Sequence, residues 1–311
     1  MFGLNLIMTT SASLIFNPTA GQNDPVEDLV TIRKILEPKI NLDICPSHKR
    51  VSTNELTHQA IEQGAQMILI AGGDGTISST VEPLIGKNIP VGIIPRGTVN
   101  AFAKALNIPI DIEAACEVIL SGKPRTVDTA TCNGKPMIVL AGIGLEPKTI
   151  AQSSHTIKKH FGMLSFILAG IKELGQFNTF ETWIETENQT LNLQAVAVTV
   201  ANTAAPTSLL AHGPANVISD DGLLDVTIFA PSNRKNAFFG AYHLLRSGFT
   251  DDATNRGDIQ YLKAKNVKVK TKPLQKVSLD GDPIEATAVE VICVPRSLNI
   301  LLPALDNFTF N

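Results

Sequence analysis

The residues best suited to chemistry form a glycine-rich stretch, Gly72-Gly73-Asp74-Gly75-Thr76. Glycine lacks a Cβ, so the backbone here can adopt positive φ and bring its N–H groups close to a bulky anion. Thr76 begins a segment with apolar residues at helical spacing, and a helix N-terminus favours a phosphate at the same place. Asp74 would repel that phosphate unless a cation lies between them, so the stretch predicts a site for a nucleotide with Mg²⁺. A plain strand-to-helix turn with Asp74 as a turn residue is the alternative.

Buried parallel strands are expected to position this loop and three others. Short apolar runs at 13–16, 42–45, 67–71 and 91–95 are expected to be strands, and those at 67–71 and 91–95 suit strands that are covered on both faces. The loops after them are Asn17-Pro18-Thr19-Ala20-Gly21, a turn at Ser47, the glycine-rich stretch, and Pro95-Arg96-Gly97-Thr98-Val99-Asn100. Helical patterns alternate with these strands through residues 12–130, which predicts an α/β domain with ligand loops at the carboxyl ends of its strands.

The pattern changes to antiparallel β-structure near residue 127. Asn133-Gly134 between two expected strands, 127–132 and 137–141, is a strong hairpin signal. Later β-segments are expected at 182–187, 191–200, 224–229, 259–262, 267–269, 277–279 and 289–294. Two amphipathic helices interrupt them, at 163–174 and about 233–246, and the first is expected to be a core helix or, less simply, a membrane-facing one. We therefore expect a β-rich second domain over 131–294, with 295–311 returning to the first domain.

Composition excludes several classes of protein. The 311 residues are 44% hydrophobic and 18% charged, as in a folded globular chain, and the net charge of −3 gives no footprint for nucleic acid. Four widely spaced cysteines and the histidines show no zinc spacing, which favours reduced thiols in a cytoplasmic protein. The N-terminus lacks a basic region and cleavage signature, and the run at 161–175 is too short to span a bilayer, so contact with lipid is expected from the aqueous side.

In the order of these loops, the chain resembles the diacylglycerol kinase catalytic domain family of bacterial soluble lipid kinases, related to sphingosine and ceramide kinases. The resemblance covers almost the whole chain. It rests on six motifs. Three are the loops Asn17–Gly21, Gly72–Thr76 and Pro95–Asn100, and three come later: Gly142-Ile143-Gly144-Leu145-Glu146, Asp221-Gly222-Leu223-Leu224-Asp225 and Asp280-Gly281-Asp282. It implies an α/β nucleotide-binding domain and a β-rich lipid domain, with ATP as co-substrate, Mg²⁺ as cofactor, and a lipid alcohol presented at a membrane surface.

The resemblance also assigns site residues. Those around the nucleotide are Asn17, Pro18, Thr19, Ala20, Gly21, Ser47, Gly72, Gly73, Asp74, Gly75, Thr76, Thr98 and Asn100. Asp74 would lie near the catalytic Mg²⁺. Asp282 stands where the family usually places a glutamate base for the lipid hydroxyl, one methylene shorter here, and Asp280 is the reserve candidate. From the residues alone, Asp280-Gly281-Asp282-Pro283 reads as a hairpin turn.

A second, structural Mg²⁺ is implied by the resemblance at Asp221, with the backbone carbonyls of Ile218 and Leu223. Oxygen ligands from a turn suit this hard cation, although Asp221-Gly222 could be only a strand entry. Two positions depart from the family pattern, because Ala101 and Ser79 stand where acidic residues are frequent.

The leading hypothesis is an ATP- and Mg²⁺-dependent kinase acting on a lipid hydroxyl such as that of diacylglycerol. An NAD kinase shares the glycine-rich loop, and a nucleotide- or lipid-binding regulator without turnover would fit Asp282 and Ala101. No Gly-Lys-Ser/Thr loop of P-loop type is present. The acceptor lipid stays open, as does the oligomeric state, a homodimer included.

Overall fold

The structure, a computed structural model, describes residues 10–144, 178–205, 208, 211, 217–250, 255–286 and 288–304. The chain divides into two compact units. Unit 1 comprises Met1–Val127 and Ser297–Asn311, and unit 2 comprises Asp128–Arg296. The boundaries expected from the sequence, at 130/131 and 294/295, fall within a few residues of this division. The chain crosses between the units within two strands, β5 (Lys123–Cys132) and β16 (Val289–Leu302).

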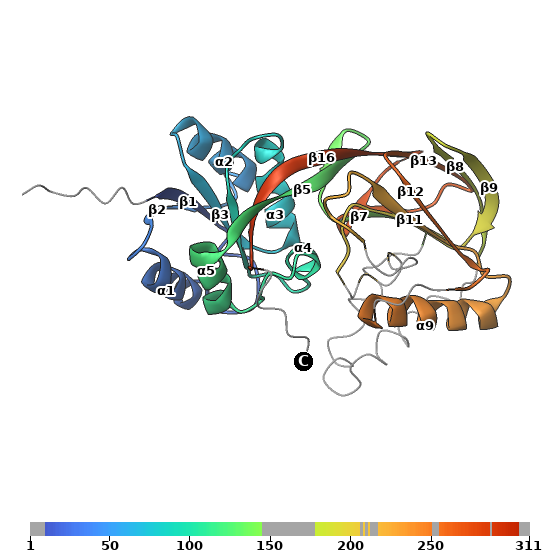
Figure 1. Ribbon diagram of the computed structural model, residues 1–311, viewed down its shortest axis with the longest axis horizontal. Coiled ribbons are helices and arrows are strands. Elements are labelled where there is room, and N and C mark those ends of the chain that lie inside the picture. The colour runs from blue at the N-terminus through green and yellow to red at the C-terminus, as the bar shows by residue number, and fades with distance from the viewer. Residues whose placement is uncertain are drawn as a thin grey trace, which may run out of the picture. The chain divides into compact units, whose positions relative to one another are not determined.

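Unit 1 is built on a parallel sheet with the strand order β2-β1-β3-β4, and the last residues of β16 pair in parallel with β4 (Figure 1). Its other strands are β1 Ser11–Phe16, β2 Asn41–Pro46, β3 Met67–Gly72 and β4 Val91–Pro95. Its helical segments are α1 Pro25–Leu36, α2 Thr53–Glu62, α3 Asp74–Val81, the 3₁₀ turn η1 Glu82–Leu84, α4 Ala101–Ala105 and α5 Ile112–Ser121. All residues of β4 and all but the first of β1 and β3 are buried, as strands covered on both faces require.

Helix starts in unit 1 follow the capping signals in the sequence. The Asp24 carboxylate accepts a hydrogen bond from the Val26 N–H at 2.8 Å, and Pro25 occupies the first turn of α1. Ser52 and Glu55 form both bonds of a capping box at the start of α2. α3 differs, because its N-cap is Gly73 and no side chain caps it. The N–H groups of its first turn are therefore available to a ligand.

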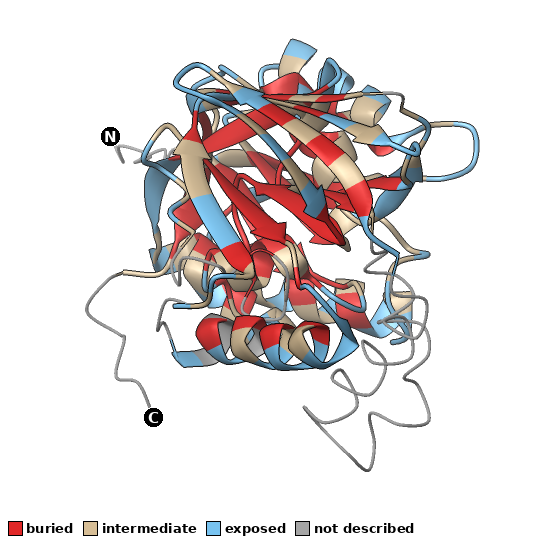
Figure 2. Cartoon of the chain, turned by 90° about the vertical axis from the view of Figure 1, so that its right-hand side faces the viewer, coloured by how far each residue is buried: buried red, intermediate tan, exposed pale blue. Residues whose placement is uncertain are grey.

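Unit 2 is a sandwich of antiparallel strands. One sheet has the order β12-β11-β10-β7-β14-β15; the other places β13 between β8 and the first part of β16, with β9 beyond β8 and the β5–β6 hairpin beside β16. Its strands, apart from β5 and β16, are β6 Lys135–Met137, β7 Leu140–Gly144, β8 Phe180–Thr186, β9 Thr190–Ala195, β10 Ala197–Ala201, β11 Leu224–Phe229, β12 Ile259–Ala264, β13 Asn266–Lys272, β14 Val277–Leu279 and β15 Asp282–Ile284. One core joins the sheets, because Val200 and Val226 share a cluster with Val267 and Val291. Figure 2 shows buried residues concentrated on the strands. The described part of this unit also contains helix α9 (Arg234–Thr250). The predicted α/β fold with a β-rich second part is confirmed.

Three expected strands differ from those observed. The run 137–141 is broken, because the Ile138 and Val139 N–H groups bond to the Asp280 carboxylate rather than to a strand. The run 191–200 divides at Val196 into β9 and β10, which belong to different sheets. The strand expected at 289–294 continues to Leu302 through Arg296, whose φ of 49° bends the chain.

Several expectations lie outside the described residues: the helix at 163–174, Leu145 and Glu146 of one family motif, and His155 and His160. Among the residues that the structure does describe, no helix has the length and apolar character needed to cross a bilayer.

Candidate active site

Three loops of unit 1 lie side by side because they leave neighbouring parallel strands at the same edge. In the strand register Phe16 lies opposite Ala71, and Gly72 lies opposite Pro95. The pairing continues into the loops, where the Asn17 N–H donates to the Ala71 carbonyl at 3.0 Å and the Arg96 N–H donates to the Gly72 carbonyl at 2.8 Å. Ser47 follows β2 and donates its N–H to the Phe16 carbonyl at 2.8 Å. The structure thus brings together the loops that the sequence predicts for a nucleotide.

Asn17 fastens two of these loops through its side chain. Its Nδ2 donates to the Thr76 hydroxyl at 2.8 Å, across 59 positions of sequence. Its Oδ1 accepts from the N–H and the hydroxyl of Thr19, at 3.0 and 2.8 Å, and its carbonyl accepts from the Ala20 N–H at 3.2 Å. The small-residue loop from Asn17 to Gly21 is therefore held in a compact turn against the start of α3.

Glycines are required where the loops touch. A Cβ on Gly97 would lie 2.6 Å from the Gly73 Cα and 2.7 Å from the Asn100 Oδ1, and a Cβ on Gly21, at φ 81°, would lie 2.2 Å from the Arg96 carbonyl oxygen. Gly75 is different, because a Cβ there would meet no atom within 4 Å. Together with the uncapped start of α3, this exposed glycine leaves open space beside backbone N–H groups. The residues present therefore fit a nucleotide phosphate.

Asp74 lies at the first position of α3. Its Oδ1 accepts a hydrogen bond from the Phe102 N–H of α4 at 3.1 Å. Its Oδ2 has no hydrogen-bond partner within the part of the chain that the structure describes. One carboxylate oxygen is thus fixed and the other is available to a hard cation such as Mg²⁺.

The neighbours of Asp74 explain two departures from the family pattern. Ala101 begins α4 and brings no acid, so Asp74 bonds to backbone there. Ser79 accepts from the Thr53 hydroxyl at 3.0 Å and links α3 to α2. Asn100, at φ 52°, exchanges hydrogen bonds with the backbone of Gly97, and Thr98 is exposed at the tip of the same loop.

The two candidate bases in unit 2 have different surroundings. Asp280 occupies the tight turn between β14 and β15 at φ 48°, and its carboxylate accepts N–H bonds from Ile138, Val139 and Leu140 at 2.9, 2.8 and 3.0 Å. Asp282 is exposed at the start of β15, opposite Leu279. The three hydrogen bonds fix the Asp280 carboxylate, so this residue positions the turn that carries Asp282.

The Asp221 loop, where the resemblance implies a structural Mg²⁺, is in contact with the ammonium group of Lys263 on β12. The Asp221 Oδ2 lies 2.6 Å from the Lys263 Nζ, and its Oδ1 accepts from the Leu223 N–H at 3.0 Å. Ile218 is 45% exposed. No cluster of three or more His, Cys, Asp or Glu side chains suited to a metal occurs among the described residues. The oxygen-rich turn suits Mg²⁺ chemically, but a metal on Asp221 would have to displace the Lys263 ammonium.

Two carboxylates lie near Lys263, the exposed Asp221 at 2.6 Å and the buried Asp225 at 3.7 Å. Burial raises the pKa of Asp225, despite the hydrogen bond that its carboxylate accepts from Tyr261 at 2.6 Å. Burial opposes the charge of Lys263, yet hydrogen bonding to Asp221 and the nearby Asp225 leave the Lys263 pKa raised overall. The ammonium therefore stays charged and supplies the positive charge that these carboxylates require.

Models of known families match both parts of this chain. The diacylglycerol kinase catalytic domain matches residues 11–132, and the YegS C-terminal NAD kinase beta sandwich-like domain matches residues 138–302. The chain belongs to the diacylglycerol kinase family of lipid kinases. The family predicted from the six motifs is confirmed.

Individual relatives agree with this assignment. An uncharacterized protein of Synechocystis sp. is 37% identical over 306 residues, which are 95% of this chain and 71% of that protein. The diacylglycerol kinase of Bacillus subtilis is 28% identical over 94% of this chain and 96% of its own length. A crystal structure from Bacillus anthracis, titled as a diacylglycerol kinase, shares the fold with a TM-score of 0.72 at 23% identity, covering 95% of this chain and 97% of that one.

The sequence did not predict two residues that hold the loops of this diacylglycerol kinase family member in place, Arg96 and Asp128. Arg96 is buried, donates from Nε to Asp28 Oδ2 at 2.7 Å and from Nη1 to the Asn17 carbonyl at 2.6 Å, and lies 4.6 Å above the Phe16 ring. It connects the β4 loop, the β1 loop and α1. The available signal was an arginine at the end of an apolar strand, since a buried arginine needs an acidic partner.

Asp128 is the second missed residue and lies where the chain enters unit 2. Its carboxylate is 1% exposed and accepts from the N–H groups of Gly222 and Arg296, both at 2.7 Å. The Asp221 loop is therefore held to the bend of β16. Nothing in the local pattern indicates this, because the partners are 94 and 168 positions away.

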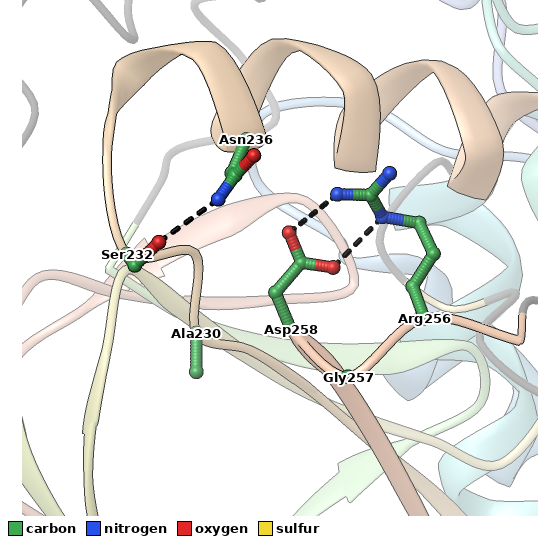
Figure 3. Close-up of a pocket in the computed structure, with 6 residues that line it drawn as sticks. All are labelled: Ala230, Ser232, Asn236, Arg256, Gly257 and Asp258. Carbon is green, nitrogen blue, oxygen red and sulfur yellow. Dashed lines mark hydrogen bonds and ion pairs between the residues drawn. The ribbon is translucent and has the colours of Figure 1, made fainter.

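A cavity of about 490 Å³ in unit 2 is lined by none of the predicted site residues (Figure 3). It is lined by Ala230, Ser232, Asn236, Arg256, Gly257 and Asp258. Arg256 donates from Nε and Nη2 to the two oxygens of Asp258, at 2.8 and 2.7 Å. The two charges compensate each other, so the cavity offers no net charge to a phosphate, and we assign it no part in phosphoryl transfer.

Proposed function

We propose that the protein is an ATP- and Mg²⁺-dependent lipid kinase that transfers the γ-phosphate to a lipid hydroxyl such as that of diacylglycerol. The observation that carries the proposal is the contact of three loops at one edge of the unit 1 sheet, fastened by the Asn17–Thr76 hydrogen bond and the Gly73–Gly97 approach. Family membership supports the same conclusion.

Phosphoryl transfer needs positioning and charge stabilisation more than covalent chemistry from the protein. The loop N–H groups and the start of α3 would hold the phosphates, and Asp74 Oδ2 would hold the cation. Mg²⁺, when bound, would neutralise charge on the transferred phosphoryl group.

The lipid hydroxyl would lose its proton to Asp282 as its oxygen bonds to the γ-phosphorus and the bond from that phosphorus to the β,γ-bridging oxygen of ATP breaks. ADP and the phosphorylated lipid would then be the products. Asp280, engaged by three backbone N–H groups, would keep the turn that presents Asp282 in place.

The test is transfer of labelled γ-phosphate from ATP to diacylglycerol, ceramide and NAD in mixed micelles. We expect a labelled lipid, with kcat reduced roughly 10²–10⁴-fold in Asp282→Asn because a general base is removed. Asp280→Asn should lower thermal stability as well as activity, since a neutral amide accepts fewer of the three N–H bonds. Asp74→Asn should raise the Mg²⁺ concentration needed for half-maximal activity, because a neutral amide binds this cation less well than a carboxylate.

Glu285→Gln is the matched control, because Glu285 is an exposed acid three positions from Asp282 on the same hairpin. Label only in NADP would replace the proposal with an NAD kinase activity. Binding of Mg-ATP with no labelled product from any acceptor would favour the non-catalytic regulator.

A further inference from the structure

Three of the four described α9 residues on the face that packs against the sheet are small. Ala237, Gly240, Leu244 and Ser247 are buried along it. A Cβ on Gly240 would lie 2.4 Å from Cε2 of Phe229, so the helix backbone rests directly on β11. Ala237 and Leu244 share a core cluster with Phe229 and Ile259 of β11 and β12. Small residues here let the helix approach closely, but they bury little apolar area.

Three large aromatic residues of α9, Phe238, Phe239 and Tyr242, are on its outer face. Phe238, Phe239 and Tyr242 are 36, 43 and 45% exposed, and the two phenylalanine rings meet edge to face with centroids 5.5 Å apart. Spacings of three and four residues place them on one side of the helix with Lys235. An amphipathic helix ordinarily buries its large apolar residues and exposes small or polar ones. The reversed arrangement needs a partner outside the fold, because a contiguous exposed apolar patch marks an interaction surface.

The charge of α9 indicates which partner. The helix carries Arg234, Lys235 and Arg246 and no acidic residue, in a chain whose net charge is −3. Aromatic side chains between basic ones are typical of helices that lie in the interface of an anionic bilayer, where rings enter the acyl boundary and cations meet phosphates. A second copy of this chain would bring two such basic faces together, and repulsion opposes that pairing.

We propose that the outer face of α9, comprising Arg234, Lys235, Phe238, Phe239 and Tyr242, docks on the surface of an anionic phospholipid bilayer. The inference rests on the proposed function in one respect, that a kinase for a lipid alcohol must reach its acceptor in a membrane. Docking of this face would hold unit 2 at the bilayer surface independently of ATP.

The experiment is co-sedimentation of the full chain with unilamellar vesicles that contain neither diacylglycerol nor ATP. Vesicles of pure phosphatidylcholine are compared with vesicles of equal parts phosphatidylcholine and phosphatidylglycerol. We expect binding to the anionic vesicles that falls with salt, and a loss of roughly tenfold or more in Phe238→Ser/Phe239→Ser and in Arg234→Gln/Lys235→Gln.

Matched controls come from α1 of unit 1. Val26→Ser/Val30→Ser removes exposed apolar side chains, and Lys34→Gln/Lys39→Gln removes two exposed charges, one of them on α1 and the other just beyond it. Neither should change vesicle binding. Wild-type protein that ignores anionic vesicles would overturn the proposal, and so would α9 variants that bind as the wild type does. A wild-type dimer in size-exclusion chromatography that Phe238→Ser/Phe239→Ser converts to a monomer, without vesicle binding, would assign the face to a second copy instead.

The outcome is separable from that of the kinase proposal. Phosphorylation of a water-soluble short-chain diacylglycerol needs no membrane, so the α9 variants should retain it at the wild-type rate. Loss of vesicle binding in the variants with no kinase activity in any protein would leave the docking face standing and refute the kinase. Intact kinase activity with no effect of α9 on binding would do the reverse.

Discussion

Single side chains hold the proposed nucleotide site together across long stretches of sequence. Asn17 bonds to Thr76 and also accepts both donors of Thr19, so one amide fixes the turn of its own loop and the distance to the next. Arg96 repeats this at the third loop through Asp28 and the Asn17 carbonyl. Both residues make side-chain hydrogen bonds in loops, beyond the ends of the paired strands. These bonds define the positions of the loops as closely as strand pairing defines the positions of the strands.

Lys263 bears on the metal dependence of the Asp221 loop. Because its ammonium lies 2.6 Å from Asp221, the Asp221 loop of the wild-type protein should contribute nothing to any difference in thermal midpoint between Mg²⁺ and EDTA. Lys263→Gln removes this cation, so the loop should then gain stability with added Mg²⁺ as RT ln(1 + [Mg²⁺]/Kd). Differential scanning calorimetry measures both.

Lys268→Gln is the control for this experiment, since Lys268 forms an exposed ion pair with Glu290 at 3.1 Å on another strand. An equal rise in thermal midpoint with Mg²⁺ in wild type and Lys263→Gln would contradict the prediction and show that the metal displaces the ammonium.

Cys45, beside the Ser47 turn, should react slowly with alkylating reagents. Burial and the neighbouring Asp43 carboxylate raise the pKa of this thiol to about 11. The thiolate is the nucleophile, so the rate of alkylation by iodoacetamide should rise about tenfold per pH unit from pH 7 through pH 10 without levelling. Asp43→Asn should accelerate the reaction by lowering the pKa. A plateau near pH 8.5 in the wild type would refute the shift.

Among the elements, the start of α3 and the loop after β4 each contain a glycine that can be replaced by alanine. Comparing the two variants distinguishes effects on packing from effects on ligand binding. Gly97→Ala places a Cβ 2.6 Å from the Gly73 Cα, so it should displace the loop and lower both stability and ATP affinity. Gly75→Ala meets nothing within 4 Å and should keep or slightly raise stability, because alanine suits a helix better than glycine. It should still weaken ATP binding, since the methyl group enters the space assigned to phosphate.

Calorimetric titration with Mg-ATP, together with urea unfolding, distinguishes these effects. Unchanged ATP affinity in Gly75→Ala would remove the phosphates from this position, whatever Gly97→Ala does.

The elements that could be predicted are those whose signals are local. The apolar runs of β1, β3 and β4, the capping box at Ser52 and the Asn133-Gly134 turn depend on adjacent residues, and the structure contains all of them. Asp280 shows the limit. Its sequence predicts a turn. Only the structure shows that its carboxylate also accepts hydrogen bonds from Ile138, directly after β6, and from Leu140, the first residue of β7, about 140 positions away. Val196 likewise lies in a stretch, 191–200, that the sequence predicts as one strand, and the change of sheet there is visible only in the structure, where the Phe229 carbonyl accepts the Val196 N–H at 2.8 Å.

At the scale of the whole molecule, Asp128 connects segments that meet where the chain leaves and re-enters unit 1. Asp128→Asn leaves only one acceptor for the N–H groups of Gly222 and Arg296, so one buried donor loses its partner. We expect a loss of about 1–3 kcal/mol in the free energy of unfolding, measured in urea.

Asp111→Asn makes the same chemical change at a helix cap that accepts one N–H, from Ala114, and asparagine caps as well as aspartate. Its stability should stay within about 0.5 kcal/mol of the wild type. Equal losses in the two variants would mean that the Asp128 carboxylate has no special role.

The position of the C-terminal residues in unit 1 also affects the order in which the chain can fold during its synthesis at the ribosome. Unit 2 is one continuous segment, whereas unit 1 is completed by Ser297–Leu302, whose Ile300 pairs with Val91 of β4. A nascent chain therefore exposes the edge of β4 throughout the synthesis of unit 2, and the sheet that carries the nucleotide loops is finished only after translation has passed residue 302. The last strand beneath the proposed nucleotide loops would therefore be added only after unit 2 has been synthesised.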